Sequence, residues 1–185
     1  TKPYFLFVGR LEKLKGLQTI ISLFQRYVKA ELWIAGGGKY EPHLRRLVNG
    51  GENVRFLGNK TKDELQVLYR NAIALVVPSI CLEVFPLVVL EAFLQRTPAI
   101  VRNIGGLPEI IHGSGGGFVY DTEAQLLCAM EELLSDKRRR DYLRDSGFRA
   151  TVQKWSADAH LASYFKLIGQ IAGSRDETSP NRNVQ

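Results

Sequence analysis

Two glutamates, Glu83 and Glu91, are separated by seven residues that are almost wholly apolar, Val-Phe-Pro-Leu-Val-Val-Leu. They lie where an apolar strand-like segment gives way to an apolar helix-like segment, and open α/β sheets bind their ligands at such junctions. Carboxylates beside so much apolar surface need water or a ligand to satisfy them. Each glutamate taken alone could equally be an ordinary exposed acid, so the pair needs support from other residues.

Two cations, Arg10 and Lys15, lie five residues apart in a loop that follows an apolar run and precedes an expected helix. Basic side chains and a helix N-terminus together favour an anion, most often phosphate. The loop is not a Walker loop, because Gly-x-x-x-x-Gly-Lys-Ser/Thr is absent, and Gly36-Gly37-Gly38 does not complete Gly-x-Gly-x-x-Gly because position 41 is Glu. The alternative is that both cations are simply solvated.

Composition narrows the classes of protein. The 185 residues suit one domain, and 45% hydrophobic with 24% charged residues is typical of a soluble globular protein. The net charge of +6 favours an anionic partner without choosing among phosphorylated small molecules, nucleic acid and acidic membrane surfaces. Two distant cysteines and three scattered histidines have no metal-ligand spacing, so we expect no bound metal. No apolar run is long enough to span a membrane and no signal peptide is evident, which predicts a soluble, cytoplasmic chain.

Apolar runs and helical periodicity alternate along the chain. Strands are expected over residues 4–9, 32–35, 54–57, 73–77, 99–101 and 117–120. Helices are expected over residues 16–27, around 44–48, 61–69 behind a Thr61–Glu64 capping box, 86–94, 123–134, 137–147 and 156–171, with a loop at 105–109. The pattern predicts an α/β, Rossmann-like fold: a mostly parallel sheet of about six strands, helices on both faces, and additional C-terminal helices.

Four motifs occur in order: Gly-Arg-Leu-x-x-x-Lys-Gly from Gly9, Glu-x-Phe-x-Leu-x-x-x-Glu-Ala from Glu83, Thr-Pro-x-Ile from Thr97, and Gly-Gly-x-Pro-Glu from Gly105. Together they resemble the C-terminal donor-binding domain of retaining group 1 glycosyltransferases with the two-Rossmann-domain (type B) fold. The resemblance extends from residue 4 to about residue 170. It implies a donor-binding domain over residues 1–172, followed by a disordered tail over 173–185.

The resemblance also implies roles for the charged residues. Arg10 and Lys15 would hold the donor diphosphate and stabilise the charge that grows on the leaving group, in place of a metal. Glu83 would lie near the donor hexose and complete the catalytic set with these two cations. Glu91 would accept hydrogen bonds from the ribose hydroxyls.

Further contacts follow from the same resemblance. The backbone amides of Leu87 and Val88 would meet the diphosphate at a helix N-terminus. Phe85 and Pro86 would lie near the sugar, although the family often has glycine at positions 84 and 86. The residues expected near the nucleotide base are Gly36, Gly38, Asn59 and Lys60, for which plain turns are the alternative. Arg96 stands where the family commonly has glycine, so a left-handed helix cap there would cost about 1 kcal/mol.

The function implied is transfer of a hexose from a nucleotide-diphospho-sugar, most readily a UDP- or GDP-sugar, to a lipid, polysaccharide or other acceptor. No cofactor is expected. An N-terminal acceptor-binding domain of the same protein is expected as partner, and through it peripheral association at the inner face of the membrane. The isolated chain should be inactive without that domain.

Two alternatives stay open: a nucleotide-sugar epimerase or sugar-phosphate synthase of the same fold, and a non-catalytic nucleotide-binding module. Nucleic acid is not expected as a partner. The basic run 137–140 is interspersed with Asp136, Asp141 and Asp145, as on a solvated helix face.

Overall fold

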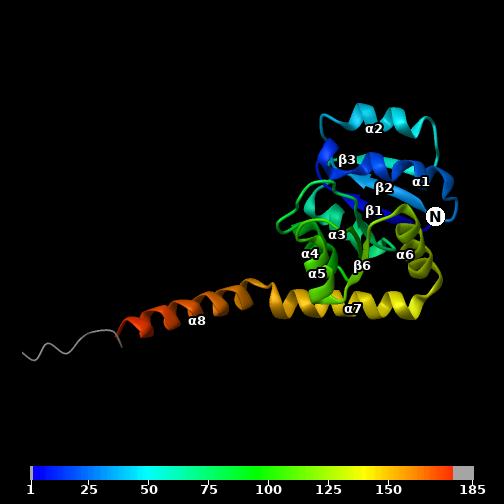
Figure 1. Cartoon of the computed structure of the whole chain (residues 1–185). Helices are drawn as coiled ribbons and strands as arrows, with labels where there is room; N and C mark the ends of the chain where they lie inside the picture. Colours follow the sequence, from blue (N-terminus) through cyan, green and yellow to red (C-terminus); the bar gives the residue numbers. More distant parts are fainter. Residues whose placement is uncertain (1, 177–185) are drawn as a thin grey trace, which may run out of the picture.

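The computed structural model describes residues 2–176 and contains one six-stranded, all-parallel sheet (Figure 1). The strands are β1 (Tyr4–Val8), β2 (Glu31–Ala35), β3 (Val54–Gly58), β4 (Leu75–Val77), β5 (Ala99–Arg102) and β6 (Gly117–Tyr120). Their order across the sheet is β3-β2-β1-β4-β5-β6, and every neighbouring pair is parallel. The predicted Rossmann-like α/β class is therefore confirmed. The order reverses between β1 and β4, which makes the carboxyl ends of these two strands the switch point where such sheets bind ligands.

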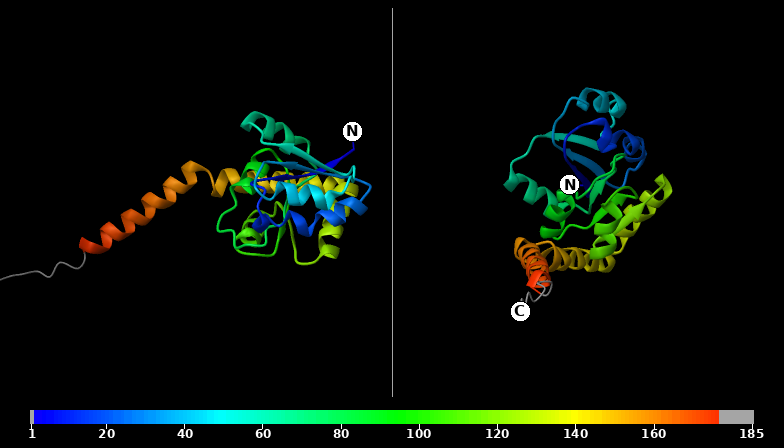
Figure 2. Two further views of the ribbon diagram at one scale, coloured as in Figure 1. Left: turned by 90° about the horizontal axis from the view of Figure 1, so that it is seen from above. Right: turned by 60° about the vertical axis from the view of Figure 1, so that its left-hand side comes forward.

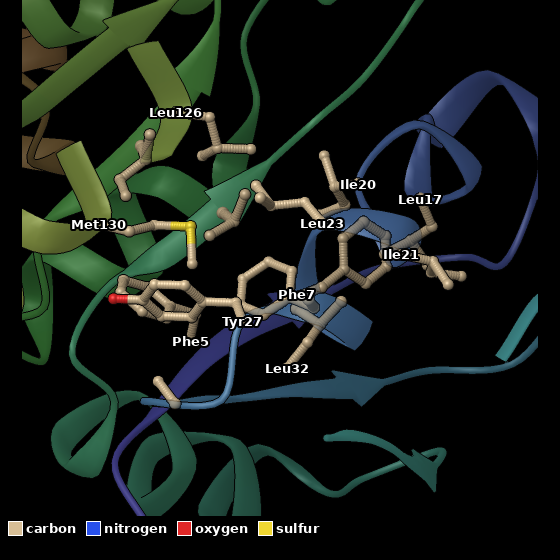
Figure 3. Packing of buried hydrophobic residues seen from close by; sticks show 14 of the residues in the cluster. Phe5, Phe7, Leu17, Ile20, Ile21, Leu23, Tyr27, Leu32, Leu126 and Met130 are labelled. Atoms are coloured by element: carbon tan, nitrogen blue, oxygen red, sulfur yellow. The ribbon is translucent and has the colours of Figure 1, made fainter. Parts of the chain in front are cut away.

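Helices cover both faces of the sheet. They are α1 (Ile21–Arg26), α2 (Glu41–Val48), α3 (Lys62–Asn71), α4 (Leu87–Leu94), α5 (Leu107–Ser114), α6 (Glu123–Ser135), α7 (Lys137–Lys154) and α8 (Ala157–Asp176), with 3-10 turns η1 (Lys13–Lys15) and η2 (Leu17–Thr19). Because successive strand residues point to opposite faces, Phe5 and Leu6 enter different cores. The Phe5 core packs against α1, α2 and α6, with Tyr27 and Met130 in close contact (Figure 3). The Leu6 core packs against α3, α4 and α5.

The predicted helix over residues 16–27 is wrong in its first half, where the 3-10 turn η2 precedes a short α1. Gly16, between η1 and η2, has a left-handed φ of 75°. A Cβ on Gly16 would lie 1.9 Å from the carbonyl oxygen of Pro78, so the chain turns here to approach the segment after β4.

The predicted loop over residues 105–109 is also wrong, because α5 begins at Leu107 with Pro108 in its first turn. Proline suits that position, since the amides there have no intrahelical partner in any case. The left-handed conformation considered at Arg96 is present, with φ 54°. The Thr61–Glu64 capping box is confirmed as well.

The C-terminal helices are longer than the sequence predicted. Helix α7 continues to Lys154, and α8 runs to Asp176, so residues 173–176 are helical and not part of a tail. The remainder of the predicted tail, 177–185, lies outside the described residues. Helix α8 extends away from the α/β body, as Figures 1 and 2 show. Its apolar side chains are exposed: Leu161, Tyr164, Phe165, Leu167, Ile168 and Ile171.

Candidate functional site

The carboxyl ends of β1 and β4 open onto a cavity of about 300 Å³. Its walls include all seven residues that the sequence predicted to meet a diphosphate or a sugar: Arg10, Lys15, Glu83, Phe85, Pro86, Leu87 and Val88. Phe7, Gly9, Val76 and Ser79 contribute the strand ends behind them. Two sequence motifs more than sixty residues apart thus form one site. They follow β1 and β4, and these two strands are neighbours at the switch point of the sheet.

Lys15 and Glu83 form an ion pair in this cavity. Lys15 Nζ lies 2.6 Å from Glu83 Oε1, and only 26% and 17% of the two side chains are exposed. The same oxygen accepts a hydrogen bond from Ser79 Oγ at 2.8 Å, and the Cys81 thiol lies 3.8 Å away. Burial would raise the pKa of the Glu83 carboxyl, but the bonds from Lys15 and Ser79 outweigh it and hold that pKa below its ordinary value. Glu83 is therefore ionised at neutral pH and can only accept hydrogen bonds.

Backbone contacts fix the loop that carries Glu83. Ile80 N donates to Leu14 O at 2.9 Å, which ties this loop to the one that carries Lys15. Gly106 N donates to Glu83 O at 2.7 Å. A Cβ on Gly105 would lie 2.7 Å from the Glu83 backbone nitrogen and oxygen. Gly105 and Gly106, the two glycines of the fourth motif, thus allow their backbone to lie directly against the backbone of Glu83 and to support it.

Arg10 is the most exposed member of the site. Its side chain is 76% exposed and pairs with Glu12 at 3.0 Å. Such a surface pair holds its partners weakly, so the guanidinium is available to an incoming anion. Arg10 lines both the Lys15–Glu83 cavity and a neighbouring one, which places it between them.

The neighbouring cavity, of about 250 Å³, lies over the ends of β1, β2 and β3. Three of the four residues predicted near the base line it, namely Gly36, Asn59 and Lys60. The fourth, Gly38, is not among its lining residues. A Cβ on Gly38 would lie 2.4 Å from Leu11 O, so this glycine allows a close backbone approach and the structure does not place it at the cavity.

Glu91 does not share the cavity of Glu83. It lines a third cavity, of about 500 Å³, between α3 and α4. There Tyr69 Oη donates to Glu91 Oε2 at 3.1 Å, and burial followed by the Glu91 charge raises the pKa of Tyr69 well above its ordinary value. Leu65 lines this cavity and the one over β1–β3, so the two adjoin. Shared lining residues thus connect the three cavities in a series, Arg10 between the first and second and Leu65 between the second and third.

Helix α4 begins at the first cavity. No side chain caps its N-terminus at Pro86, and the earliest amides of an α-helix have no intrahelical acceptor. The amides of Leu87 and Val88 are therefore suited to an anion there.

Sequence reasoning missed three residues of the site. Ser79 could have been found, since it lies two residues after β4 and four before Glu83. Leu65 and Tyr69 have no local signal, because only the packing of α3 on α4 brings them to Glu91. Within residues 2–176 no group of three or more His, Cys, Asp or Glu side chains is arranged to hold a metal ion.

The fold and the site define a doubly wound α/β protein whose switch point carries a cavity lined by two cations, Arg10 and Lys15, and by the start of α4. The family model "Glycosyl transferases group 1" matches residues 1–150. An uncharacterized glycosyltransferase, MJ1607, from Methanocaldococcus jannaschii is 35% identical over 91% of this chain. A D-inositol 3-phosphate glycosyltransferase from Pseudarthrobacter chlorophenolicus is 34% identical over 92% of it. The chain belongs to the group 1 glycosyl transferases.

The chain spans less than half the length of these relatives, 46% of the first and 44% of the second.

Solved structures agree on the fold. A sucrose-phosphate synthase from Thermosynechococcus elongatus superposes with a TM-score of 0.80 at 25% identity, over 94% of this chain and 46% of that one. Anabaena Alr3699/HepE in complex with UDP superposes with a TM-score of 0.77 at 17% identity, over 92% of this chain and 48% of that one. The C-terminal domain of a group 1 glycosyl transferase (LpcC) from Francisella tularensis superposes with a TM-score of 0.68 at 22% identity, over 83% of this chain and 87% of that one.

None of the helices among residues 2–176 combines the length and the apolar character that crossing a bilayer requires.

Proposed function

We propose that this chain is the donor-binding half of a retaining, metal-independent glycosyltransferase of the type B fold. It would move a hexose from a nucleotide-diphospho-sugar to a lipid, polysaccharide or other acceptor. The observation that carries the proposal is the single cavity at the switch point in which Arg10, Lys15 and the N-terminus of α4 surround the ionised Glu83. The UDP bound in the HepE structure of the same fold supports a nucleotide as the ligand.

The cations would act on the leaving group. As the bond between the sugar and the diphosphate breaks, negative charge accumulates on the diphosphate oxygens. Lys15 is partly buried, so its attraction to that charge is stronger than it would be in water. Arg10 would turn from Glu12 toward the phosphates, and the amides of Leu87 and Val88 would add further donors.

The carboxylates would bind hydroxyl groups. Glu83 holds Lys15 in place and, as an acceptor, would orient the hexose through its hydroxyls. Tyr69 occupies one acceptor position of Glu91, and a carboxylate offers roughly four, so Glu91 can also accept from the ribose. The cavity lined by Gly36, Asn59 and Lys60 would take the base, with Leu65 between base and ribose.

The rest of the reaction would come from outside this chain. An N-terminal acceptor-binding domain of the same protein would supply the acceptor site, and through it the enzyme would associate peripherally with the inner face of the membrane, on the cytoplasmic side. The relatives, more than twice as long as the matched segment, support such a partner. On this view the isolated chain binds the donor and transfers nothing.

One alternative has specific support. The sucrose-phosphate synthase superposes with a TM-score of 0.80, so a sugar-phosphate synthase would also suit this fold. The donor site would be the same in both cases, and the acceptor domain would distinguish them.

Titration calorimetry of the 185-residue chain with UDP, GDP and ADP tests the donor site. We expect one diphosphate to bind, and Lys15→Ala to weaken it at least tenfold, because a hydrogen bond to a charged group contributes about 1.5–3 kcal/mol. Arg10→Ala should also weaken binding. If no nucleotide binds, or if Arg10→Ala and Lys15→Ala bind as tightly as the parent, the diphosphate assignment is wrong.

Arg26→Ala is the matched control. It removes an exposed arginine that pairs with Glu123 at 2.8 Å. Arg26 ends α1 and is not a lining residue of any of the three cavities. Nucleotide binding by this variant should match that of the parent.

A further inference from the structure

An aromatic contact joins the C-terminal helices to the donor cavity. Trp155 is the C-cap residue of α7 and directly precedes Ser156, whose hydroxyl accepts a hydrogen bond from Ala159 N in the first turn of α8. Its ring lies 6.3 Å from that of Phe85, at 74°, which is an edge-to-face arrangement. Phe85 in turn lines the cavity that contains Lys15 and Glu83.

Trp155 itself is held firmly against the body of the domain. It packs against the core shared by α3, α4 and α5. A Cβ on Gly113 would lie 3.6 Å from Cζ2 of Trp155, so the indole lies along the end of α5. The neighbouring Lys154 Nζ donates to Gly113 O at 2.6 Å. The indole is therefore a fixed support on one side and a contact for Phe85 on the other.

Phe85 has little support of its own. Residues 83–86 have no helical or strand structure, and Val84 beside it is 90% exposed. Phe85 is half-exposed. The backbone of this segment is tied at Glu83 through Gly106, and the aromatic ring that packs on Phe85 is that of Trp155. The position of the Phe85 ring in the cavity wall thus depends on a residue outside the cavity.

We infer that Trp155 is a positioning residue for the sugar end of the donor site: it holds Phe85 in the wall that would enclose the donor hexose. The inference rests on the proposed function. Neither Trp155 nor Phe85 lines the cavity over β1–β3 that would take the base, so the nucleotide end should not depend on Trp155. Because α8 follows Trp155 directly, a displacement of α8 would reach the sugar end first.

The test compares a nucleotide-sugar with its free nucleotide. The 185-residue chain and its Trp155→Leu variant are titrated with UDP and UDP-glucose, and with GDP and GDP-mannose. We expect Trp155→Leu to lower the affinity for the nucleotide-sugar about three- to tenfold and to leave the affinity for the free nucleotide within twofold. Trp155→Phe, which keeps an aromatic ring at this position, should recover most of the loss.

Two further variants exclude a general loss of structure. Phe85→Leu should show the same selective loss, and the double variant should be no worse than either single one, because both changes remove the same contact. Three outcomes would each overturn the inference. They are an equal loss of affinity for the nucleotide-sugar and the free nucleotide, additive effects in the double variant, and no change in affinity for either ligand. If the parent chain binds neither kind of ligand, the proposed function fails and the inference fails with it; if the parent binds both and Trp155→Leu is not selective, only the inference fails.

Discussion

At each edge of the sheet, a glutamate with little exposed surface pairs with a cation. At the carboxyl edge, Glu83 pairs with Lys15 and Ser79. At the amino edge, Glu31 is only 5% exposed and accepts hydrogen bonds from Trp33 Nε1 at 2.7 Å and Arg55 at 2.8 Å.

The two clusters share their electrostatics. In each, burial alone would raise the pKa of the carboxyl group, and the hydrogen bonds to its partners lower it below its ordinary value. They differ in what lies beside them. Both oxygens of Glu31 are occupied, and Trp33 is stacked on Tyr4 with ring centroids 3.8 Å apart. The partners of Glu83 converge on Oε1, and the group faces a cavity. A lowered pKa therefore does not by itself identify a functional carboxylate, because the carboxylate beside a cavity and the one within the packed edge share it.

The largest expected effect is on stability at the amino edge. Glu31→Ala would leave the Trp33 indole N–H without its acceptor and Arg55 without its carboxylate, and should destabilise the chain by about 2–3 kcal/mol. Urea unfolding measures this. Nucleotide affinity should stay within twofold of the parent, and a large loss of affinity in a folded variant would contradict the comparison.

Glu83→Gln should show the opposite pattern. The amide keeps the shape of the side chain but removes the charge that holds Lys15, so nucleotide-sugar affinity should fall about tenfold while stability changes by about 1 kcal/mol or less. Calorimetry with a nucleotide-sugar and urea unfolding of the same sample measure both. A loss of stability as large as that of Glu31→Ala would show that the two clusters are alike.

The third prediction concerns how the free energy of unfolding depends on pH in the acid range. Both carboxyl groups have a lower pKa in the folded chain than the ordinary value near 4.3, so in this range the unfolded chain binds more protons. Their contribution to stability is present above that ordinary pKa and is lost as the pH falls through the lower folded values. Unfolding free energies measured from pH 6 down to pH 3 should decrease, and the decrease should be smaller in Glu31→Gln. An identical acid dependence in parent and variant would contradict this.

The smallest effect should come from Arg26→Ala. The exposed Arg26–Glu123 pair is screened by water, so its loss should change stability by about 0.5 kcal/mol or less and leave binding unchanged. Urea unfolding checks the first expectation and nucleotide titration the second. A loss of stability comparable to that of Glu31→Ala would mean that solvent exposure does not explain the difference between the Arg26–Glu123 and Glu31–Arg55 ion pairs.

Local patterns were sufficient for much of the fold. Each strand was predicted within a few residues. The central strands β1, β2, β4 and β5 were predicted because a strand buried on both faces requires a continuous apolar run. The capping box at Thr61 was predicted because its hydrogen bonds join residues three apart. The break at Gly16 could not be predicted, since its cause is the carbonyl of Pro78 far along the chain.

The sequence by itself determined the types of the site residues and the edge of the sheet at which they gather: Arg10 and Lys15 follow β1, and Glu83 follows β4. Only the tertiary structure decided their contacts. The 2.6 Å pair of Lys15 with Glu83, the separate cavity of Glu91 beside Tyr69, and the contact of Trp155 with Phe85 all join distant segments. The physical reason is that hydrophobic periodicity and capping act over a few residues, whereas the strand order and the packing of helices on the sheet determine which segments meet.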